Sequence, residues 1–337
     1  MNDVARLAGV SHMTVSRVLN DHPNVSPATR QRVLEAVRQL GYRPNPMARG
    51  LAGRRSRVVG VVSFDTILYG PAATLLGIER AARAAGYGIS IVILEHVDHA
   101  NMASALSALA DQSVAGVVVI APQTAAVLHS MPLGMAAVAV EFNVSGEIPA
   151  ISVDQVTGAR MAVQHLIDLG HRQVWHLSGP RDLHETQGRI EGWQAALADA
   201  GLATPRLMTG DWSARSGYDA GLELAARDDV TAVFAGNDHM AMGMMRAFHE
   251  RGIRVPDDVS IIGFDDIPEA EFLSPPLTTI RQDFDEVGRR RIAALLRRIE
   301  ADLPHGPDRP SPDPHVAPIL VPRHSTAPPQ RSTRGCG

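Results

Sequence analysis

From Val58 onward the chain alternates short apolar runs with amphipathic stretches, and few folds accommodate such an alternation. The apolar runs are VVGVV from residue 58, GISIVIL from 88, AGVVVIA from 115, AAVAV from 136, VWHLS from 174, TAVFAG from 231 and VSIIGF from 259. Nearly continuous apolar character is typical of parallel strands that are covered on both faces. Stretches with helical spacing separate these runs, at 76–85, 157–170, 190–200, 240–251 and 284–299. This order predicts an α/β body with parallel sheets, and its length predicts two lobes rather than one core.

The region before this body differs from it in charge. Residues 3–57 hold ten of the 32 basic residues but only three of the 36 acidic ones, a formal charge of +7. The remainder of the chain holds 22 basic and 33 acidic residues, a formal charge of −11. A small basic head on a large acidic body indicates that the head contacts nucleic acid.

Turn and cap residues divide the basic head into three helices. Gly9 can end a short first helix in the left-handed conformation, and Ser11 can cap a second helix over 12–19. Ser26 followed by Pro27 marks the start of a third helix. Apolar residues at helical spacing predict a small core shared by these helices: Val4, Ala8, Val15, Val18, Leu19, Val33, Val37 and Leu40. Two short helices about a glycine turn, completed by a third helix, form a helix-turn-helix unit.

The second helix of such a unit would lie in the major groove, with its first turn nearest the bases. That turn holds His12, Met13 and Thr14, and Arg17 follows one turn later. An arginine there can donate two hydrogen bonds to O6 and N7 of guanine, although a lone arginine is more often a solvated surface charge. Other short polar side chains suit phosphate oxygens, which position a protein without reading sequence. These side chains are Thr14, Ser16 and Asn20.

Residues 3–56 resemble the DNA-binding head of the LacI/GalR family of bacterial transcription regulators, without a gap through the hinge: DVARLAGVSHMTVSRVLNDHPNVSPATRQRVLEAVRQLGYRPNPMARGLAGRRS. The resemblance implies that His12, Met13 and Arg17 lie at the base-reading positions. Family members carry a few more residues before the position of Asn2, and one of these caps the first helix.

The segment NPMARGLA, residues 45–52, matches the hinge helix of the family. Ala48 and Leu51 are expected to contact DNA from this helix. Leu51 would enter the minor groove at the operator centre, where an apolar side chain can open a base step and bend the duplex. The helix is well below the roughly 12 to 15 residues that an isolated helix needs in water, and Gly50 weakens it further. We expect it to be disordered off DNA and to fold when it pairs with its dimer mate on the operator.

Three segments of the body are close to the sugar-responsive members of the same family: GDWSARSGYDAG from residue 210, FAGNDHMAMGMMRA from 234 and SIIGFDDIPEAEFLSPPLTTIRQDF from 260. The implied fold resembles a type I periplasmic sugar-binding protein, with two Rossmann-like lobes joined by three crossings and the ligand between them. A hinged cleft of this kind suits a switch, because closure around a ligand reorients the lobes.

The resemblance also implies where the parts of the chain begin and end. The expected parts are a helix-turn-helix domain over 1–44, a hinge helix and linker over 45–57, an effector-binding domain over 58–325 and a disordered tail over 326–337. Within the effector domain, we expect an N-terminal lobe of about 58–152 and 283–312 and a C-terminal lobe of about 153–282 and 313–325.

Seven residues fall at the family's effector positions, and each has chemistry that suits a sugar. They are Phe64, Glu141, Arg189, Trp212, Asn237, Asp265 and Gln282. A guanidinium can bond two neighbouring hydroxyls, a carboxylate accepts and an amide both donates and accepts, and an aromatic ring can lie against a pyranose face. Glu141 follows a predicted strand, at the edge where parallel sheets place ligands. The alternatives are structural, since a tryptophan is usually core and Asp265-Asp266 could cap a turn.

Several chemistries lack their sequence signals. The chain has no lysine, which excludes a Walker-type phosphate loop and a Schiff-base lysine, and it has neither G-x-S-x-G nor H-E-x-x-H. We therefore expect no enzyme, metal site or cofactor. Cys336 is the only cysteine, so no internal disulfide is possible. No apolar signal segment precedes the head and no run is long enough to span a membrane, which predicts a cytoplasmic protein that reaches the nucleoid through DNA.

These observations predict a homodimeric repressor of carbohydrate-utilisation genes that binds double-stranded operator DNA and a sugar effector. Two heads are needed to span a palindromic operator, and no leucine heptad suggests a tetramer. The main alternative is a co-repressor mechanism with a purine or nucleoside-like ligand. A sugar-binding transport or chemotaxis receptor shares the body fold, but it would not need the basic head.

Overall fold

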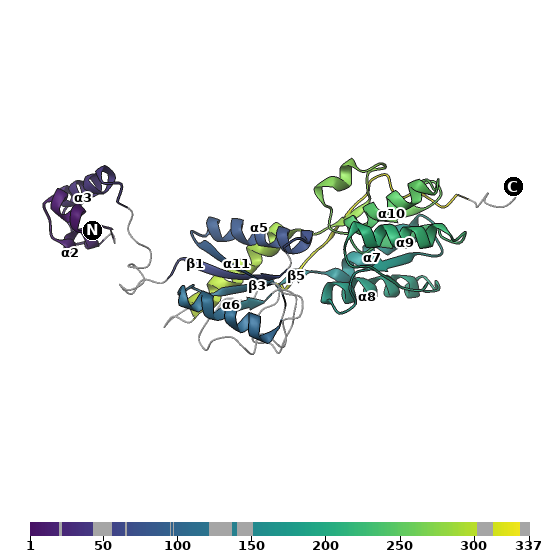
Figure 1. Cartoon of the computed structure of the whole chain (residues 1–337), viewed down its shortest axis with the longest axis horizontal. Helices are drawn as coiled ribbons and strands as arrows, with labels where there is room; N and C mark the ends of the chain where they lie inside the picture. The colour runs from purple at the N-terminus through teal and green to yellow at the C-terminus, as the bar shows by residue number, and fades with distance from the viewer. Residues whose placement is uncertain are drawn as a thin grey trace. The chain divides into compact units, whose positions relative to one another are not determined.

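The computed structural model describes residues 1–19, 22–42, 56–64, 66–94, 96, 98–120, 137–139, 151–301 and 313–330 (Figure 1). The chain divides into two compact units, Met1–Ser56 and Arg57–Gly337. The predicted hinge segment lies outside the described residues.

The first unit contains three helices, α1 (Asn2–Ala8), α2 (His12–Leu19) and α3 (Pro27–Gln39), as the sequence predicts. They share a core whose members are almost fully buried, namely Val4, Val15, Val18, Val33 and Ala36. The prediction that Leu40 belongs to this core is wrong, because α3 ends at Gln39 and Leu40 is 46% exposed.

The ends of these helices follow from local chemistry. Gly9 ends α1 with a left-handed φ of 63°, a conformation that glycine adopts without steric cost. The Ser26 side chain accepts a hydrogen bond from the amide of Thr29 (3.3 Å) and so caps α3. Met1, at the N-cap of α1, makes no side-chain capping hydrogen bond.

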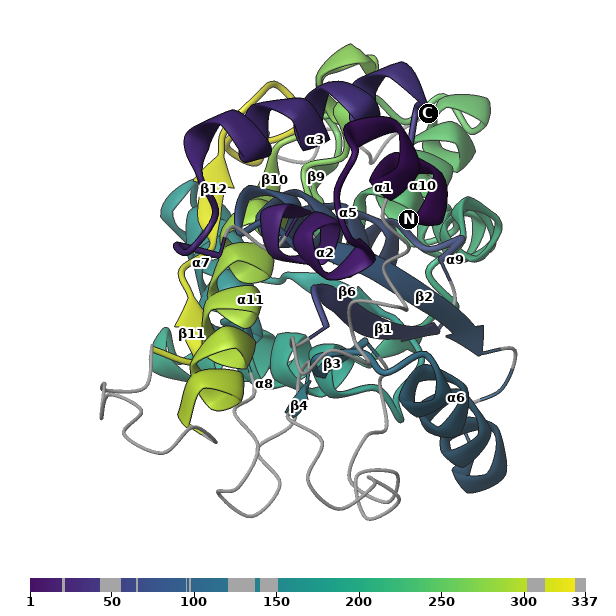
Figure 2. The ribbon, with the colours of Figure 1, turned by 90° about the vertical axis from the view of Figure 1, so that its left-hand side faces the viewer.

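The N-terminal lobe of the second unit is built on a parallel sheet with strand order β2–β1–β3–β4. Its strands are β1 (Val58–Phe64), β2 (Gly88–Leu94), β3 (Val117–Ile120) and β4 (Ala137–Ala139). Its helices are α5 (Tyr69–Ala84), α6 (His99–Asp111) and α11 (Phe284–Ala301). α5 and α11 pack on one face of the sheet and α6 packs on the other (Figure 2).

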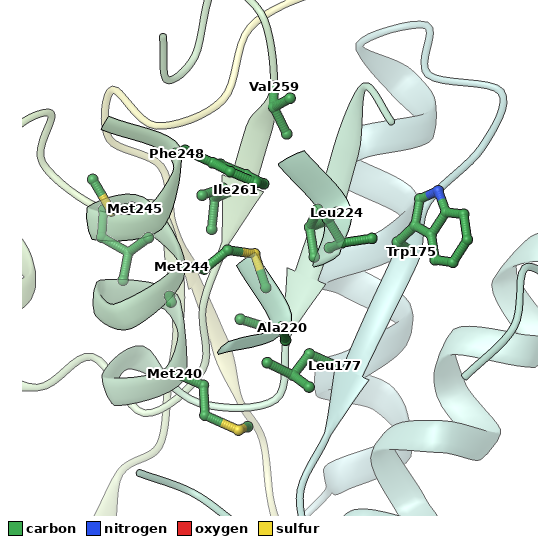
Figure 3. Close-up of a cluster of buried hydrophobic side chains, with 14 of the residues drawn as sticks. Trp175, Leu177, Ala220, Leu224, Met240, Met244, Met245, Phe248, Val259 and Ile261 are labelled. Atoms are coloured by element: carbon green, nitrogen blue, oxygen red, sulfur yellow. The ribbon is translucent and has the colours of Figure 1, made fainter. Parts of the chain in front are cut away.

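The C-terminal lobe repeats this plan with strand order β7–β6–β8–β9, again parallel. Its strands are β6 (Trp175–Ser178), β7 (Met208–Thr209), β8 (Ala232–Ala235) and β9 (Ser260–Ile262). Its helices are α7 (Gln155–Asp168), α8 (His184–Asp199), α9 (Ala214–Ala225), α10 (Asp238–Glu250) and the short η2 (Pro268–Phe272). α7 and α8 cover one face. α9 and α10 cover the other, where methionines of α10 interlock with Leu224 and Leu177 (Figure 3).

The chain passes between the two sheets three times, on short strands and their extensions. β5 (Ser152–Val153) pairs in parallel with β11 (His315–Val316). β10 (Thr279–Arg281) leads into α11 and pairs in antiparallel fashion with β12 (Ile319–Val321). Two lobes of parallel sheet joined by three crossings confirm the predicted fold class.

The segment after β12 is ordered further than predicted. Ser325 is fully buried, and its backbone carbonyl and hydroxyl exchange hydrogen bonds with the backbone of Ile261 (2.8 and 2.6 Å). The Ala327 amide donates to Ser260 Oγ (3.0 Å), and the Ala327 carbonyl lies 3.0 Å from Nε2 of His171. Disorder from residue 326 is therefore wrong for 326–330, because these residues continue along the C-terminal lobe; residues 331–337 lie outside the described residues.

Candidate functional site

The outer face of α2 presents the side chains that were predicted to read bases. His12, Met13 and Arg17 are exposed, and Met13 is 65% accessible, whereas Val15 and Val18 are buried in the core of the head. The core therefore fixes the rotation of α2 and leaves these three side chains on its outer face.

The residues predicted to contact phosphates are less exposed than those predicted to read bases, or lie outside the described residues. Thr14 and Ser16 are half-buried. The Thr14 hydroxyl lies 2.9 Å from the Ser11 hydroxyl, which also accepts from the Thr14 amide (3.2 Å), so Thr14 takes part in capping α2. The other predicted DNA contacts, Asn20, Ala48 and Leu51, lie outside the described residues.

In the second unit a cleft of about 790 Å³, including space open to solvent, is lined by both lobes. Six of the seven predicted effector residues line it, namely Phe64, Arg189, Trp212, Asn237, Asp265 and Gln282. Glu141, the seventh, lies outside the described residues.

The parallel sheets bring these side chains together, because ligand-facing loops of such sheets follow the carboxyl ends of the strands. Phe64 is the last residue of β1. Asn237 follows β8, and Asp265 follows β9 with a φ of 113°. A non-glycine residue in that conformation is strained. The Asp265 amide donates to the carbonyl of Ile280 (2.8 Å), which ties this strained turn to the crossing strand β10.

Four side chains form a closed polar ring at the base of the cleft, which we call the Arg–Gln ring. Nε of Arg189 donates to Oε1 of Gln155 (2.9 Å), and Nε2 of Gln155 donates to Oε1 of Gln282 (2.9 Å). Nε2 of Gln282 donates to Oδ1 of Asp265 (2.6 Å), which lies 3.8 Å from the Arg189 guanidinium. The ring joins α8, the loop after β9 and two of the three lobe crossings.

Arg189 is held on its faces as well as at its edges. Its guanidinium carbon lies 3.9 Å from the ring centre of Phe264 and 5.2 Å from that of Trp212. NH1 donates to the carbonyl of Gly236. Only 5% of Arg189 is exposed, so its position is fixed before any ligand arrives.

Trp212 and Asn237 support each other beside the Arg–Gln ring. Asn237 Nδ2 donates to the Trp212 carbonyl (3.1 Å), and Asn237 Oδ1 accepts from the Met240 amide (2.8 Å) as the N-cap of α10. A β-carbon at Gly179 would overlap the indole of Trp212, so glycine is required there for the indole to lie where it does. The indole is therefore packed on backbone and only 7% of the residue is exposed.

The ionisable groups of the cleft experience burial and negative charge. Burial raises the pKa of the Asp265 carboxyl, and the Arg189 charge and the Gln282 hydrogen bond oppose that rise. The pKa of the Tyr69 hydroxyl is raised first by burial and then by Asp265, Asp266 and other carboxylates. Asp266 itself is held between the guanidinium groups of Arg281 and Arg323, each at 2.6 Å.

Sequence reasoning missed several residues that line the cleft. They are Leu68, Tyr69, Gly70, Pro71, Thr74, Ile120, Gln155, Leu183, Glu185 and Phe284. The available signal was position, because Tyr69 and Gln155 each begin the helix that follows a strand, at the ligand-facing edge of the sheet.

The described residues form neither a metal-ion cluster nor a membrane-spanning helix. Within the described ranges no three His, Cys, Asp or Glu side chains gather as they would around a metal ion. Among the helices of those ranges, none combines the length and apolar character needed to cross a membrane.

Comparison with known proteins accounts for both units. The family model for bacterial regulatory proteins of the lacI family matches residues 1–45, and the model for the periplasmic binding protein-like domain matches residues 163–326. The lactose operon repressor of Escherichia coli K12 is 34% identical over 299 residues, covering 88% of this chain and 83% of the repressor. The ribose operon repressor of the same strain is 34% identical over 306 residues, or 89% of this chain and 92% of that repressor.

Solved structures agree with these sequence matches. The crystal structure of the lac repressor dimer bound to operator and the anti-inducer ONPF has a TM-score of 0.87 and 33% identity, and covers 96% of this chain and 98% of the repressor chain. The complex of the transcriptional regulator CelR with cellobiose has a TM-score of 0.70 and 31% identity, with coverage of 96% and 98%. The chain therefore belongs to the lacI family of bacterial regulatory proteins.

Proposed function

We propose that this protein is a DNA-binding repressor of carbohydrate-utilisation genes whose hold on its operator is controlled by a sugar in the cleft. The observation that carries the proposal is the convergence of aromatic, amide and charged side chains on one cleft, in a chain that also carries a helix-turn-helix head. The cleft is assigned a binding role and no catalytic one, and the protein acts in the cytoplasm, where its operator lies.

The head supplies sequence recognition. α2 enters the major groove with His12, Met13 and Arg17 toward the bases, and Arg17 donates to a guanine. Thr14, Ser16 and Asn20 hold phosphates. Ala48 and Leu51 contact the minor groove from the hinge helix. A homodimer presents two heads to the two halves of a palindromic operator.

The cleft supplies control. Phe64 and Trp212 lie against the faces of a sugar ring, while Glu141, Arg189, Asn237, Asp265 and Gln282 take its hydroxyl groups. Sites for small ligands commonly combine an apolar or aromatic surface with a few fixed polar groups, and this supports the assignment. The sugar shifts the dimer between two states because it binds one lobe arrangement better than the other, and by linkage DNA must affect sugar affinity equally.

The coupled experiment has two stages. Thermal-shift screening of the full chain against mono- and disaccharides, with hypoxanthine and guanine as a second arm, identifies the effector class. Binding to an operator enriched from random duplexes is then measured with and without each hit. A sugar that weakens operator binding is expected. A purine that strengthens it would establish the co-repressor alternative, which relatives named PurR at 32% identity make worth testing.

Base reading by α2 is tested separately with Arg17→Ala. The variant should lose about 1 to 3 kcal/mol of binding free energy on the enriched operator and much less on random DNA. Equal losses on both duplexes would make Arg17 a phosphate contact.

A further inference from the structure

Asp266, the residue after Asp265, does not line the cleft, yet its carboxylate is held from two sides. Its Oδ2 atom accepts a hydrogen bond from Nε of Arg281 (2.6 Å), and its Oδ1 atom accepts one from Nη2 of Arg323 (2.6 Å). Only 6% of the Asp266 side chain is exposed. We call Asp266, Arg281 and Arg323 the Asp266 clamp. Because none of the three lines the cleft, the clamp can affect a ligand there only through other residues.

The two arginines of the clamp belong to the paired strands on which the chain passes between the lobes. Arg281 is the last residue of β10, and Arg323 follows β12, the antiparallel partner of β10. Arg323 is itself fixed, because Nη1 donates to the Leu277 carbonyl (2.8 Å) and its amide donates to Oγ1 of Thr278 (2.9 Å). The clamp therefore joins the loop after β9 to both strands of this pair.

The clamp lies directly beside polar groups of the cleft. Asp265 pairs with Gln282 within the Arg–Gln ring (2.6 Å), and the next residue on one segment, Asp266, pairs with the preceding residue on the other, Arg281. Between them the Asp265 amide donates to the Ile280 carbonyl (2.8 Å). A change at Asp266 is thus one residue away from the carboxylate and the amide side chain to which the proposed function assigns sugar hydroxyl groups.

The backbone of this loop has a conformation that must be held in place. Asp265 has a φ of 113° and Asp266 has a φ of 57°, so two consecutive residues other than glycine have positive φ. Such conformations are costly and persist where the surrounding structure fixes them. The two charge-assisted hydrogen bonds of Asp266 supply a side-chain contribution to this restraint. Without them the turn can relax, and the Asp265 side chain moves with it.

We infer that Asp266 is a positioning residue for the effector cleft: its clamp fixes the turn that places the Asp265 carboxylate against Gln282, and it thereby sets the affinity for the sugar. The inference rests on the proposed function, because it takes the ligand to be a sugar. Polar groups that are fixed before a ligand arrives bind it at a lower entropic cost. Residues outside the contact surface commonly keep such groups in place.

Asp266→Asn tests the clamp, because it removes the charge and keeps the shape of the side chain. Asp229→Asn is the matched control, since Asp229 accepts two hydrogen bonds from Arg227 (2.9 and 2.8 Å) on the exposed surface of the same lobe. Each full chain is titrated calorimetrically with glucose, galactose, ribose, cellobiose and lactose. For the sugar that binds the parent most tightly, Asp266→Asn should lower the affinity about tenfold. Asp229→Asn should stay within about twofold of the parent.

Hydrogen exchange of the sugar-free proteins separates positioning from a general loss of stability. The Asp265 amide is protected by its hydrogen bond to Ile280, so release of the turn speeds its exchange. Exchange should therefore rise over residues 263–267 in Asp266→Asn and stay unchanged in β6 and β8. Faster exchange throughout the lobe would make Asp266 a stabilising residue only and would overturn the inference.

Arg281→Gln is a milder variant that keeps the inference testable if Asp266→Asn does not fold. It removes one arm of the clamp, whose side chain is 50% exposed, and leaves Arg323 bound to Asp266. Sugar affinity should fall about threefold, with faster exchange over the same residues.

The remaining outcomes separate the inference from the function on which it rests. A sugar that binds Asp266→Asn as tightly as the parent, or a loss of affinity that Asp229→Asn shares, overturns the inference and leaves a sugar-controlled repressor. Exchange over 263–267 that is as slow in Asp266→Asn as in the parent overturns it whichever ligand the cleft takes. A purine that binds the parent while every sugar fails overturns the sugar-controlled function.

Discussion

The two walls of the cleft are built from different chemistry. Among the described residues, the N-terminal lobe contributes mainly apolar and aromatic side chains, with Phe64, Tyr69, Ile120 and residues near them. The C-terminal lobe and the crossings contribute the Arg–Gln ring, whose side chains are hydrogen-bonded to one another, and Asn237, which is bonded to the backbone of Trp212 and Met240. The polar wall is therefore fixed before a ligand arrives, and the carbon wall can close over whatever the polar wall holds. Among the described residues, the side chains suited to hydroxyl groups lie in the C-terminal lobe and the crossings, and closure adds the apolar surface of the N-terminal lobe.

Removing Arg189 should damage the polar wall most. Arg189→Ala leaves Asp265 buried without its counter-charge and deprives Gln155 of a donor, so the free energy of unfolding should fall by about 3 to 5 kcal/mol. Sugar binding should also be lost. The free energy of unfolding of both Arg189→Ala and the control Arg160→Ala is measured in urea. Arg160 is a suitable control because it pairs with Asp199 on the surface, where the Arg160 side chain is 44% exposed and that of Asp199 is 61% exposed. Similar losses in the two variants would mean that the ring adds no stability.

Acid should weaken the C-terminal lobe through His176, which lies in β6 behind the polar wall. Nδ1 bonds the Phe234 carbonyl (2.9 Å), and the imidazole stacks on the Phe234 ring at 4.5 Å. Burial lowers the pKa of His176 from 6.5 to about 4, a hydrogen bond to Phe234 opposes this, and Arg189 lowers it a little further. Between pH 6.5 and about 4 the folded state therefore binds fewer protons than the unfolded state. The stability that neutral His176 contributes is lost as the pH falls through this range.

Protonation of His176 should lower the free energy of unfolding by about 3 kcal/mol in total once the pH falls below the pKa that His176 has in the folded protein. His176→Phe removes the titrating group, so the difference in unfolding free energy between parent and variant should shift by this amount from neutral pH to pH 4. A difference that stays constant with pH would show that the imidazole is not buried in its neutral form. The two carboxyls with raised pKa, Asp238 and Asp265, act in the opposite direction but are common to both proteins.

Breaking the Arg–Gln ring at Gln155 tests whether the polar wall acts as one unit. Gln155→Leu removes the acceptor for Arg189 and the donor to Gln282, and it should weaken sugar binding by about 1 to 3 kcal/mol. Gln155→Glu keeps the acceptor and removes only the donor, so its affinity should lie between those of the parent and Gln155→Leu. Calorimetric titration with the sugar identified by screening gives the three values. Equal sugar affinities of the three proteins would show that the Arg–Gln ring does not contribute to binding.

The sequence was a better guide to the fold and the motif residues than to the rest of the cleft. Alternating apolar runs were enough to predict two parallel sheets, because burial on both faces demands them. Trp212, Asn237 and Asp265 could be predicted because they lie in segments that resemble the family. Gln155 was missed because its role depends on Gln282, 127 residues away, and no local pattern encodes that meeting.

Two local predictions failed for related reasons. Leu40 continues the helical spacing of α3, but helix α3 ends one residue earlier, and spacing alone does not fix a helix end. The segment after Arg323 has the composition of a disordered tail, yet Ser325 and Ala327 find backbone and hydroxyl partners on β9. Composition indicates how much apolar surface a segment can bury. This segment is held mainly by hydrogen bonds, so its composition did not predict its order.

The smallest effect is expected on the carbon wall. Phe64→Ala removes a half-buried ring at the end of β1, so sugar affinity should fall about tenfold, or 1.4 kcal/mol, while the Arg–Gln ring stays intact. Phe272→Ala is the control, because that ring is 80% exposed and does not line the cleft. The informative quantity is selectivity among ring-matched neutral sugars. If the polar wall alone distinguishes hydroxyl patterns, Phe64→Ala weakens all of them equally; a change in their order of affinity would mean that the carbon wall also reads the sugar.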